Sequence, residues 1–129
     1  MNTNQRPHSL TEVAEWSSTC NELSYNLADF LHEFQARPAA AMLECRPRLL
    51  AQVFAGGEIC DAYLAATAAT LAARIGEPSP DWAVEPDRYL HSPWFASPGA
   101  DMRACLLLES PARFRERNLF VTANALSVA

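Results

Sequence analysis

Cysteine and histidine are the residues of this 129-residue chain best suited to hold a metal or act as nucleophiles. The thiols are widely spaced along the chain: Cys20, Cys45, Cys60 and Cys105. The imidazoles are equally dispersed: His8, His32 and His91. No two cysteines have the short spacing of a zinc or thiol–disulfide motif. We therefore expect no metal and no cofactor, and four reduced thiols that serve mainly as small packing residues.

Motifs for catalysis are also absent from the sequence. There is no Gly-x-Ser-x-Gly, and Gly56-Gly57 is not followed by the Gly-Lys-Ser of a phosphate-binding loop. Asp29 and Glu33 flank His32, but the sequence shows no partner for them on another helix, so a solvated helix face is the simpler interpretation. The sequence predicts a protein that is not an enzyme, and an uncatalogued hydrolase is only a third hypothesis.

Two groups of side chains could instead recognise another molecule. One is the arginine-rich run RFRER at residues 113–117, and the other is a set of aromatic residues within the proline-rich stretch 77–98. Arginine and aromatic residues are enriched at protein interfaces. The alternatives are that the arginines pair with nearby acids and that the aromatic rings cover the core. The acids in question are Asp101, Glu109 and Glu116.

From these groups we predict one docking surface for a protein partner. It consists of Trp94, Phe95, Arg103, Arg113, Arg115 and Arg117. The second hypothesis is a small-ligand pocket, lined by Trp82, Tyr89 and Trp94. Residues 102–129 carry four arginines against two glutamates, whereas residues 1–101 carry six arginines against thirteen acids, so an acidic partner would be oriented on approach. A second copy of the chain, forming a homodimer, is an alternative partner.

The overall composition excludes several classes of partner. The net charge is −5, and all ten basic residues are arginine. An acidic body does not match a phosphate backbone, and no polybasic stretch suits a membrane surface. The polar N-terminus MNTNQRPHSLTE lacks the apolar region of a secretory signal, and no apolar run is long enough to span a bilayer. We expect a cytoplasmic protein that binds neither nucleic acid nor membrane.

Helical periodicity dominates the elements that must position these residues. Ser9 and Glu12 have the spacing of a capping box, and apolar residues then recur at helical intervals, which predicts one long helix near 9–36. An alanine-rich stretch predicts a second helix near 58–75, ended by Gly76. We expect an all-α, compact, single-domain helical bundle over residues 9–129, preceded by a flexible N-terminus at 1–8.

The remaining segments are shorter. We predict a helix at 38–45 that restarts over 46–54, a helix at 102–109, and a short helix at 112–117 capped by Ser110. Five prolines make 77–98 an irregular, aromatic-rich segment that wraps the bundle. Leu119-Phe120-Val121 has the composition of a strand but no obvious partner strand.

Residues 71–128 resemble the C-terminal module of a set of small bacterial regulator and antitoxin-like proteins. The matching pieces are PDW (80–82), DRYL (87–90), PWF (93–95), MRA (102–104), SPARF (110–114), RNLFV (117–121) and Leu126. In that set the module often follows a helix-turn-helix domain, and other members resemble antitoxins encoded beside nucleotidyltransferase-type toxins. The resemblance implies regulation through a protein partner and supplies no catalytic residues. A single helix over 9–34 would depart from the regulator form, which needs two short helices and a tight turn.

Overall fold

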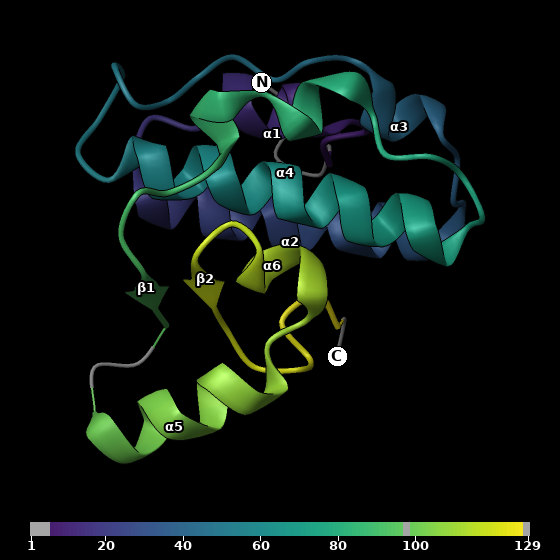
Figure 1. Cartoon of the computed structure of the whole chain (residues 1–129). Coiled ribbons are helices and arrows are strands. Elements are labelled where there is room, and N and C mark those ends of the chain that lie inside the picture. The colour runs from purple at the N-terminus through teal and green to yellow at the C-terminus, as the bar shows by residue number, and fades with distance from the viewer. Residues whose placement is uncertain (1–5, 97–98, 128–129) are drawn as a thin grey trace.

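The computed structural model describes residues 6–96 and 99–127, and its central element is the alanine-rich helix α4 (Gly57–Arg74). Small buried residues cover several sides of this helix: Ala62, Ala65, Ala66, Ala68, Ala69 and Ala72. Helices α2 (Cys20–Ala36) and α6 (Ala112–Arg115) therefore pack on it, as do the 3-10 helices η1 (Asp81–Val84) and η2 (Pro86–Arg88) (Figure 1). Gly76, at φ 73°, ends α4 with the paired hydrogen bonds of a Schellman motif, as predicted.

The prediction of one helix over 9–36 is wrong, because the chain breaks into α1 (Leu10–Glu15) and α2. Thr19 is the N-cap of α2 and accepts a hydrogen bond from the Glu22 amide, while the Glu22 carboxylate accepts one from the Ser18 amide. This is a second capping box, and it starts a new helix where the apolar spacing alone runs on.

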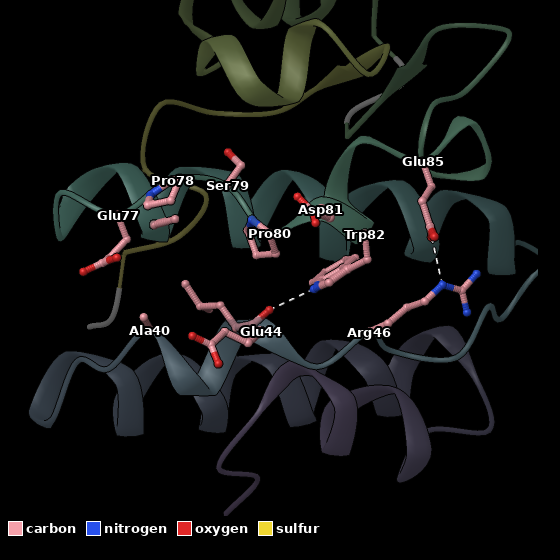
Figure 2. Close-up of a pocket in the computed structure, with 12 residues that line it drawn as sticks. Ala40, Glu44, Arg46, Glu77, Pro78, Ser79, Pro80, Asp81, Trp82 and Glu85 are labelled. Carbon is pink, nitrogen blue, oxygen red and sulfur yellow. Dashed lines mark hydrogen bonds and ion pairs between the residues drawn. The ribbon is translucent and has the colours of Figure 1, made fainter.

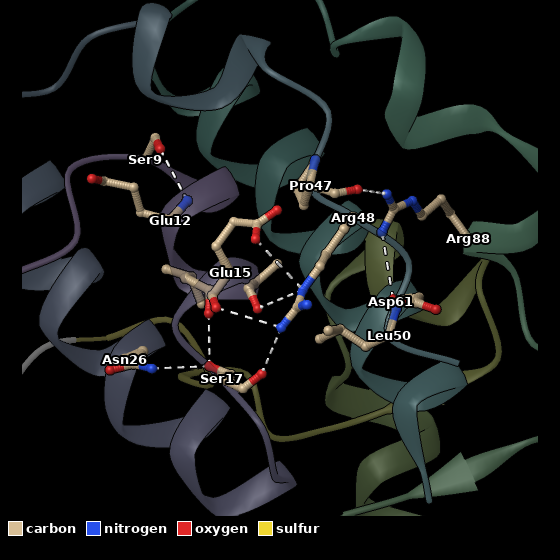
Figure 3. A network of polar contacts seen from close by, with 12 residues as sticks. Ser9, Glu12, Glu15, Ser17, Asn26, Pro47, Arg48, Leu50, Asp61 and Arg88 are labelled. Carbon is tan, nitrogen blue, oxygen red and sulfur yellow. Dashed lines mark hydrogen bonds and ion pairs between the residues drawn. The ribbon is translucent and has the colours of Figure 1, made fainter. Parts of the chain in front are cut away.

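A buried polar network closes the break between α1 and α2 (Figure 3). The Ser17 hydroxyl donates to the Val13 carbonyl at 2.7 Å and accepts from the Asn26 amide at 2.9 Å. The Arg48 guanidinium donates to the carbonyls of Ala14 and Ser17 at 3.3 and 3.1 Å. These bonds satisfy carbonyls that the end of a helix leaves without partners.

The other segments follow the predictions in part. Helix α5 (Ala100–Glu109) agrees with the helix expected at 102–109. The helix expected at 38–45 is shorter, α3 (Ala41–Glu44), and in place of its continuation over 46–54 the chain is irregular at 46–50 and forms a turn at 51–53. Ser110 does not cap α6, whose N-cap is Pro111. The Ser110 hydroxyl donates instead to the Leu106 carbonyl at 2.6 Å and accepts from the Val121 amide at 2.8 Å.

The strand-like segment at 119–121 has a partner that the sequence did not reveal. Strand β2 (Leu119–Phe120) pairs in parallel with β1 (Trp94–Phe95), with Trp94 beside Leu119 and Phe95 beside Phe120. Two-residue strands carry too little alternation to be recognised as a pair. The pairing ties the end of the proline-rich segment to the C-terminal region.

The described part of the chain is therefore mostly α-helical, with one short two-stranded sheet. Its core lies between α1, α2 and α4 and extends through Trp82, Phe114 and Leu119. Residues 77–96 follow α4 through η1 and η2 to β1. No helix in the described ranges is both long and apolar enough to cross a membrane. Residues 1–5, within the N-terminus expected to be flexible, lie outside the described residues, and Arg6 lies 3.6 Å from Glu33.

Candidate functional site

Helix α5 lies apart from the α2–α4 layer, with β2 and α6 between them (Figure 1). Only one of its described side chains is buried, that of Leu106, at 1% exposure. Met102, Leu107 and Leu108 are exposed, and Leu108 retains 85% of its accessible surface. Successive residues of an α-helix point about 100° apart, so apolar side chains occur on several sides of α5. Helices of this kind are normally covered on most of their surface.

Three of the predicted docking residues lie on β1 and α5: Trp94, Phe95 and Arg103. Neighbouring residues of a strand point to opposite faces, and Trp94 and Phe95 do so here. Trp94 lines a groove against α2 and α4, whereas the Phe95 ring stacks on Phe120 at 4.9 Å. The Arg103 guanidinium lies 5.1 Å from the Phe95 ring centroid, a cation–π contact that joins α5 to the sheet. We define the α5 surface as Met102, Arg103, Leu107 and Leu108.

Arg113 and Arg115 are exposed on α6, but Arg117 is not available to a partner. Its side chain is 1% exposed and donates to the carbonyls of Ala83 and Arg113, both at 2.8 Å. It also lies 4.7 Å from the Tyr89 ring centroid. The prediction that Arg117 belongs to the docking surface is therefore wrong: it holds the η1 segment against the C-terminal region.

This difference in burial predicts that replacing Arg117 lowers stability strongly, whereas replacing Arg113 and Arg115 has little effect on it. Replacing Arg117 by methionine should lower the free energy of unfolding by about 2–3 kcal/mol, because the buried Ala83 carbonyl and the partly buried Arg113 carbonyl lose a charged donor. Replacing Arg113 and Arg115 together by serine should change it by less than about 0.5 kcal/mol, since both are exposed. Urea denaturation of the two variants measures both values. Equal stability of the two would contradict the buried role of Arg117.

The three aromatic residues predicted to share a ligand pocket lie in different places. Trp82 is buried and its indole donates to the Leu43 carbonyl at 2.9 Å. Tyr89 contacts Arg117, and Trp94 faces the groove against α2. The single pocket predicted from Trp82, Tyr89 and Trp94 is therefore not formed.

Trp82 lines a cavity of about 530 Å³ between α3, the end of α4 and η1 (Figure 2). Four acidic residues border it: Glu44, Glu77, Asp81 and Glu85. Arg46 crosses one side of the cavity and pairs with Glu85 at 2.9 Å. Most of these acids are exposed to solvent, so their charges are screened and their hydration is largely kept.

A larger and more apolar groove, of about 710 Å³, runs between α2, α4 and the C-terminal region. Its floor combines apolar residues of the two helices with Trp94 and Val121: Leu23, Leu27, Leu31, Ile59 and Tyr63. Burial raises the pKa of the Tyr63 hydroxyl, so the ring stays neutral. Volume and lining are those of sites that take a small apolar ligand.

Two thiols lie together at one end of this groove. The Cys20 and Cys60 sulfurs are 3.8 Å apart, although the residues are forty positions apart in sequence. Burial raises the pKa of the Cys60 thiol to about 12, and the neighbouring Cys20 adds to the effect. Sequence spacing could not reveal this pair, because α2 and α4 bring it together only in the folded chain. No cluster of three metal-ligating side chains occurs among the described residues.

A buried ion pair fixes the start of α4 (Figure 3). The Asp61 carboxylate accepts hydrogen bonds from the amides of Leu50 and Ala51 at 2.6 and 3.1 Å, and lies 3.8 Å from Arg88. Burial raises the Asp61 pKa, while the Leu50 amide and Arg88 act in the opposite direction. Arg88 also donates to the Pro47 carbonyl. Asp61 and Arg88 thus hold three segments together.

Comparisons with protein-family models, with curated proteins and with solved structures find no match to this chain. A function therefore has to be inferred from the surfaces that the chain itself presents.

Proposed function

We propose that this chain is a non-catalytic interaction protein that binds an acidic protein partner through the α5 surface. The observation that supports the proposal most strongly is the uncovered apolar character of α5. Met102 and Leu107 are about half exposed and Leu108 is almost fully exposed, while Leu106 is the one buried side chain among those of the helix that the structure describes. A ten-residue helix gains little stability by itself and depends on contacts for its order. A partner that covers Leu107 and Leu108 would supply them.

Charge favours an acidic partner. Arg103 and Arg115 form no ion pair with the described residues, and Arg113 has only an exposed pair with Glu116 at 3.5 Å. These cations lie in the segment 102–129, the positive part of an otherwise negative chain. A protein with carboxylates around an apolar cleft would be attracted to this end and repelled by the rest. Arginine suits such contacts, because its planar group can bind a carboxylate through two hydrogen bonds.

Direct binding to DNA is not part of the proposal. One objection to DNA binding was that a single helix over 9–34 does not match a helix-turn-helix. The structure removes that objection, because α1 and α2 are separate helices. The charge objection stays: α2 contains no arginine, and Glu22 and Asp29 are exposed on it. The resemblance to regulator and antitoxin-like modules supports a protein partner. We place the interaction in the bacterial cytoplasm.

A co-expression experiment tests the proposal. The tagged chain is expressed with the product of the adjacent gene, because regulators and antitoxins of the resembling kind are encoded beside their partners. We expect the unchanged chain to retain that product and the variant L107S/L108S to bind it at least about tenfold more weakly, as for central interface residues. The matched control is Y25S/V84S, which removes two exposed apolar residues elsewhere on the surface and should bind normally.

Three results would contradict the proposal. The first is that the unchanged chain fails to retain the neighbour's product, and the second is that both double variants retain it equally. The third is that light scattering gives the mass of a dimer for the unchanged chain and of a monomer for L107S/L108S, because a second copy would then occupy the α5 surface.

The apolar groove supports a second candidate function, the binding of a small apolar ligand. The supporting observation is its volume of about 710 Å³ with Trp94 at its edge. Titration with the dye 1-anilinonaphthalene-8-sulfonate tests it. Saturable binding that is lost on replacing Leu27 by glutamine would favour this function, and binding that does not saturate would exclude it.

A further inference from the structure

We propose that Cys20 and Cys60 are a modification site, a pair of thiols that closes to a reversible disulfide on reaction with a small-molecule disulfide such as oxidised glutathione. Three features of the structure carry this inference: the distance between the two sulfurs, their unequal exposure, and their position on the two longest helices.

The distance between the sulfurs is short for unbonded residues so far apart in sequence. Their separation of 3.8 Å has to shorten to about 2 Å for a covalent bond. Cys20 is the first residue of α2, where the chain has just left a turn, and its sulfur lies 3.6 Å from the Ala55 carbonyl. Bond formation therefore requires the two sulfurs to approach each other by about 1.8 Å, the difference between 3.8 Å and about 2 Å.

The two thiols differ in the way a two-step exchange requires. Cys20 is exposed, so it can meet a dissolved disulfide, whereas Cys60 is only 6% exposed and is shielded from direct attack. The raised pKa of Cys60, caused first by burial, keeps that thiol protonated and makes it a poor nucleophile toward a dissolved disulfide. Cys20 is therefore the attacking thiol and Cys60 the resolving one.

The chemistry balances without any further reactant. The Cys20 thiolate attacks one sulfur of oxidised glutathione, and one glutathione thiolate leaves. Cys60 then loses its proton to solvent and attacks the Cys20 sulfur of the mixed disulfide, which breaks the bond to the second glutathione. The protein pair loses two electrons, and the oxidised glutathione becomes two reduced molecules. Excess reduced glutathione reverses both steps.

The bond would join the first turns of α2 and α4 at one end of the apolar groove, which both cysteines line. It would fix the distance between these helices there. Neither cysteine belongs to the α5 surface, so this inference does not depend on the proposed protein partner.

The experiment uses the full chain with Cys45→Ser and Cys105→Ser, which removes the other two thiols, both exposed. After incubation with oxidised glutathione, we expect an intact mass lower by two hydrogens and a tryptic fragment joining Cys20 to residues 49–74. A chain that keeps glutathione on Cys20, a disulfide between two chains, or no reaction at all would each overturn the proposal.

A third substitution separates the two steps. Adding Cys60→Ser should stop the reaction at the mixed disulfide on Cys20, whereas adding Cys20→Ser should leave Cys60 unmodified. If either triple variant fails to fold, rapid acid quenching of the chain that keeps both thiols gives the same information. The mixed disulfide on Cys20 should then appear first and decay as the internal bond forms, and glutathione appearing first on Cys60 would refute the assigned order.

Discussion

Replacing Asp61 by asparagine should lower the free energy of unfolding by about 3–5 kcal/mol, the usual effect of breaking a buried ion pair. The Asp61 carboxylate accepts from the amides of Leu50 and Ala51 and faces the buried Arg88. An asparagine amide group can accept through only one of its two polar atoms, so one backbone donor loses its partner. The buried guanidinium would also lose its counter-charge.

Urea denaturation followed by circular dichroism measures this loss. The matched control is Asp29→Asn, which removes the same charge from an exposed position of α2 and should change stability by less than about 0.5 kcal/mol. A total stability of about 5–15 kcal/mol is usual for a protein domain, so the Asp61 variant should lose a substantial part of its stability. Similar midpoints for the two variants would mean that the buried pair does not hold α4 in place.

The second large effect is expected for Gly57→Ala, at least about 3 kcal/mol, because the added carbon has no space. A Cβ at Gly57 would lie 1.9 Å from the Leu50 carbonyl oxygen, which is backbone and cannot swing aside. The segment that carries Leu50 would have to move, and with it the amides that bind Asp61. Both substitutions therefore disturb the contact between residues 50–51 and Asp61. Gly57→Ala displaces the two amides, and Asp61→Asn changes the group that accepts from them.

Gly99→Ala is the control for this variant, since a Cβ at Gly99 meets no atom within 4 Å. We expect its unfolding midpoint in urea to match that of the unchanged chain. An unchanged midpoint for Gly57→Ala as well would contradict the close approach of residues 50–51 to the start of α4.

The fold was predictable from sequence where one signal was long and uninterrupted. The alanine-rich stretch ending at Gly76 gave α4 almost to the residue, since a glycine with positive φ is the common way to end a helix. The break before α2 was missed although its signal was present. Thr19 and Glu22 form a capping box, but Val13, Cys20 and Leu27 keep a seven-residue spacing across it, and the apolar pattern therefore hid the turn.

The candidate site was less predictable, because its features depend on burial and on distant contacts. Arg117 belongs to an arginine-rich run that reads as a solvated turn, yet the fold buries it against Ala83 and Tyr89. Leu107 and Leu108 lie in a helix that was predicted, but nothing in the sequence indicated that these two side chains would stay exposed. The proximity of Cys20 and Cys60 likewise required the packing of α2 on α4.

Several residues that carry the resemblance to antitoxin-like modules have packing roles in this structure. Trp82 binds the Leu43 carbonyl, Arg88 binds the Pro47 carbonyl, and Asn118 binds the Leu90 carbonyl.

Hydrogen–deuterium exchange of the chain, alone and with the adjacent gene's product, tests the central proposal most directly, because it locates binding without changing any residue. The amides of α5 should exchange fast in the free chain, since Leu106 is the one buried side chain over residues 102–109, and α4 should exchange slowly. In the complex we expect slower exchange over residues 102–109 and little change in α4. Unchanged exchange in α5, or protection confined to the groove-lining residues of α2 and α4, would contradict the proposal that α5 binds the partner.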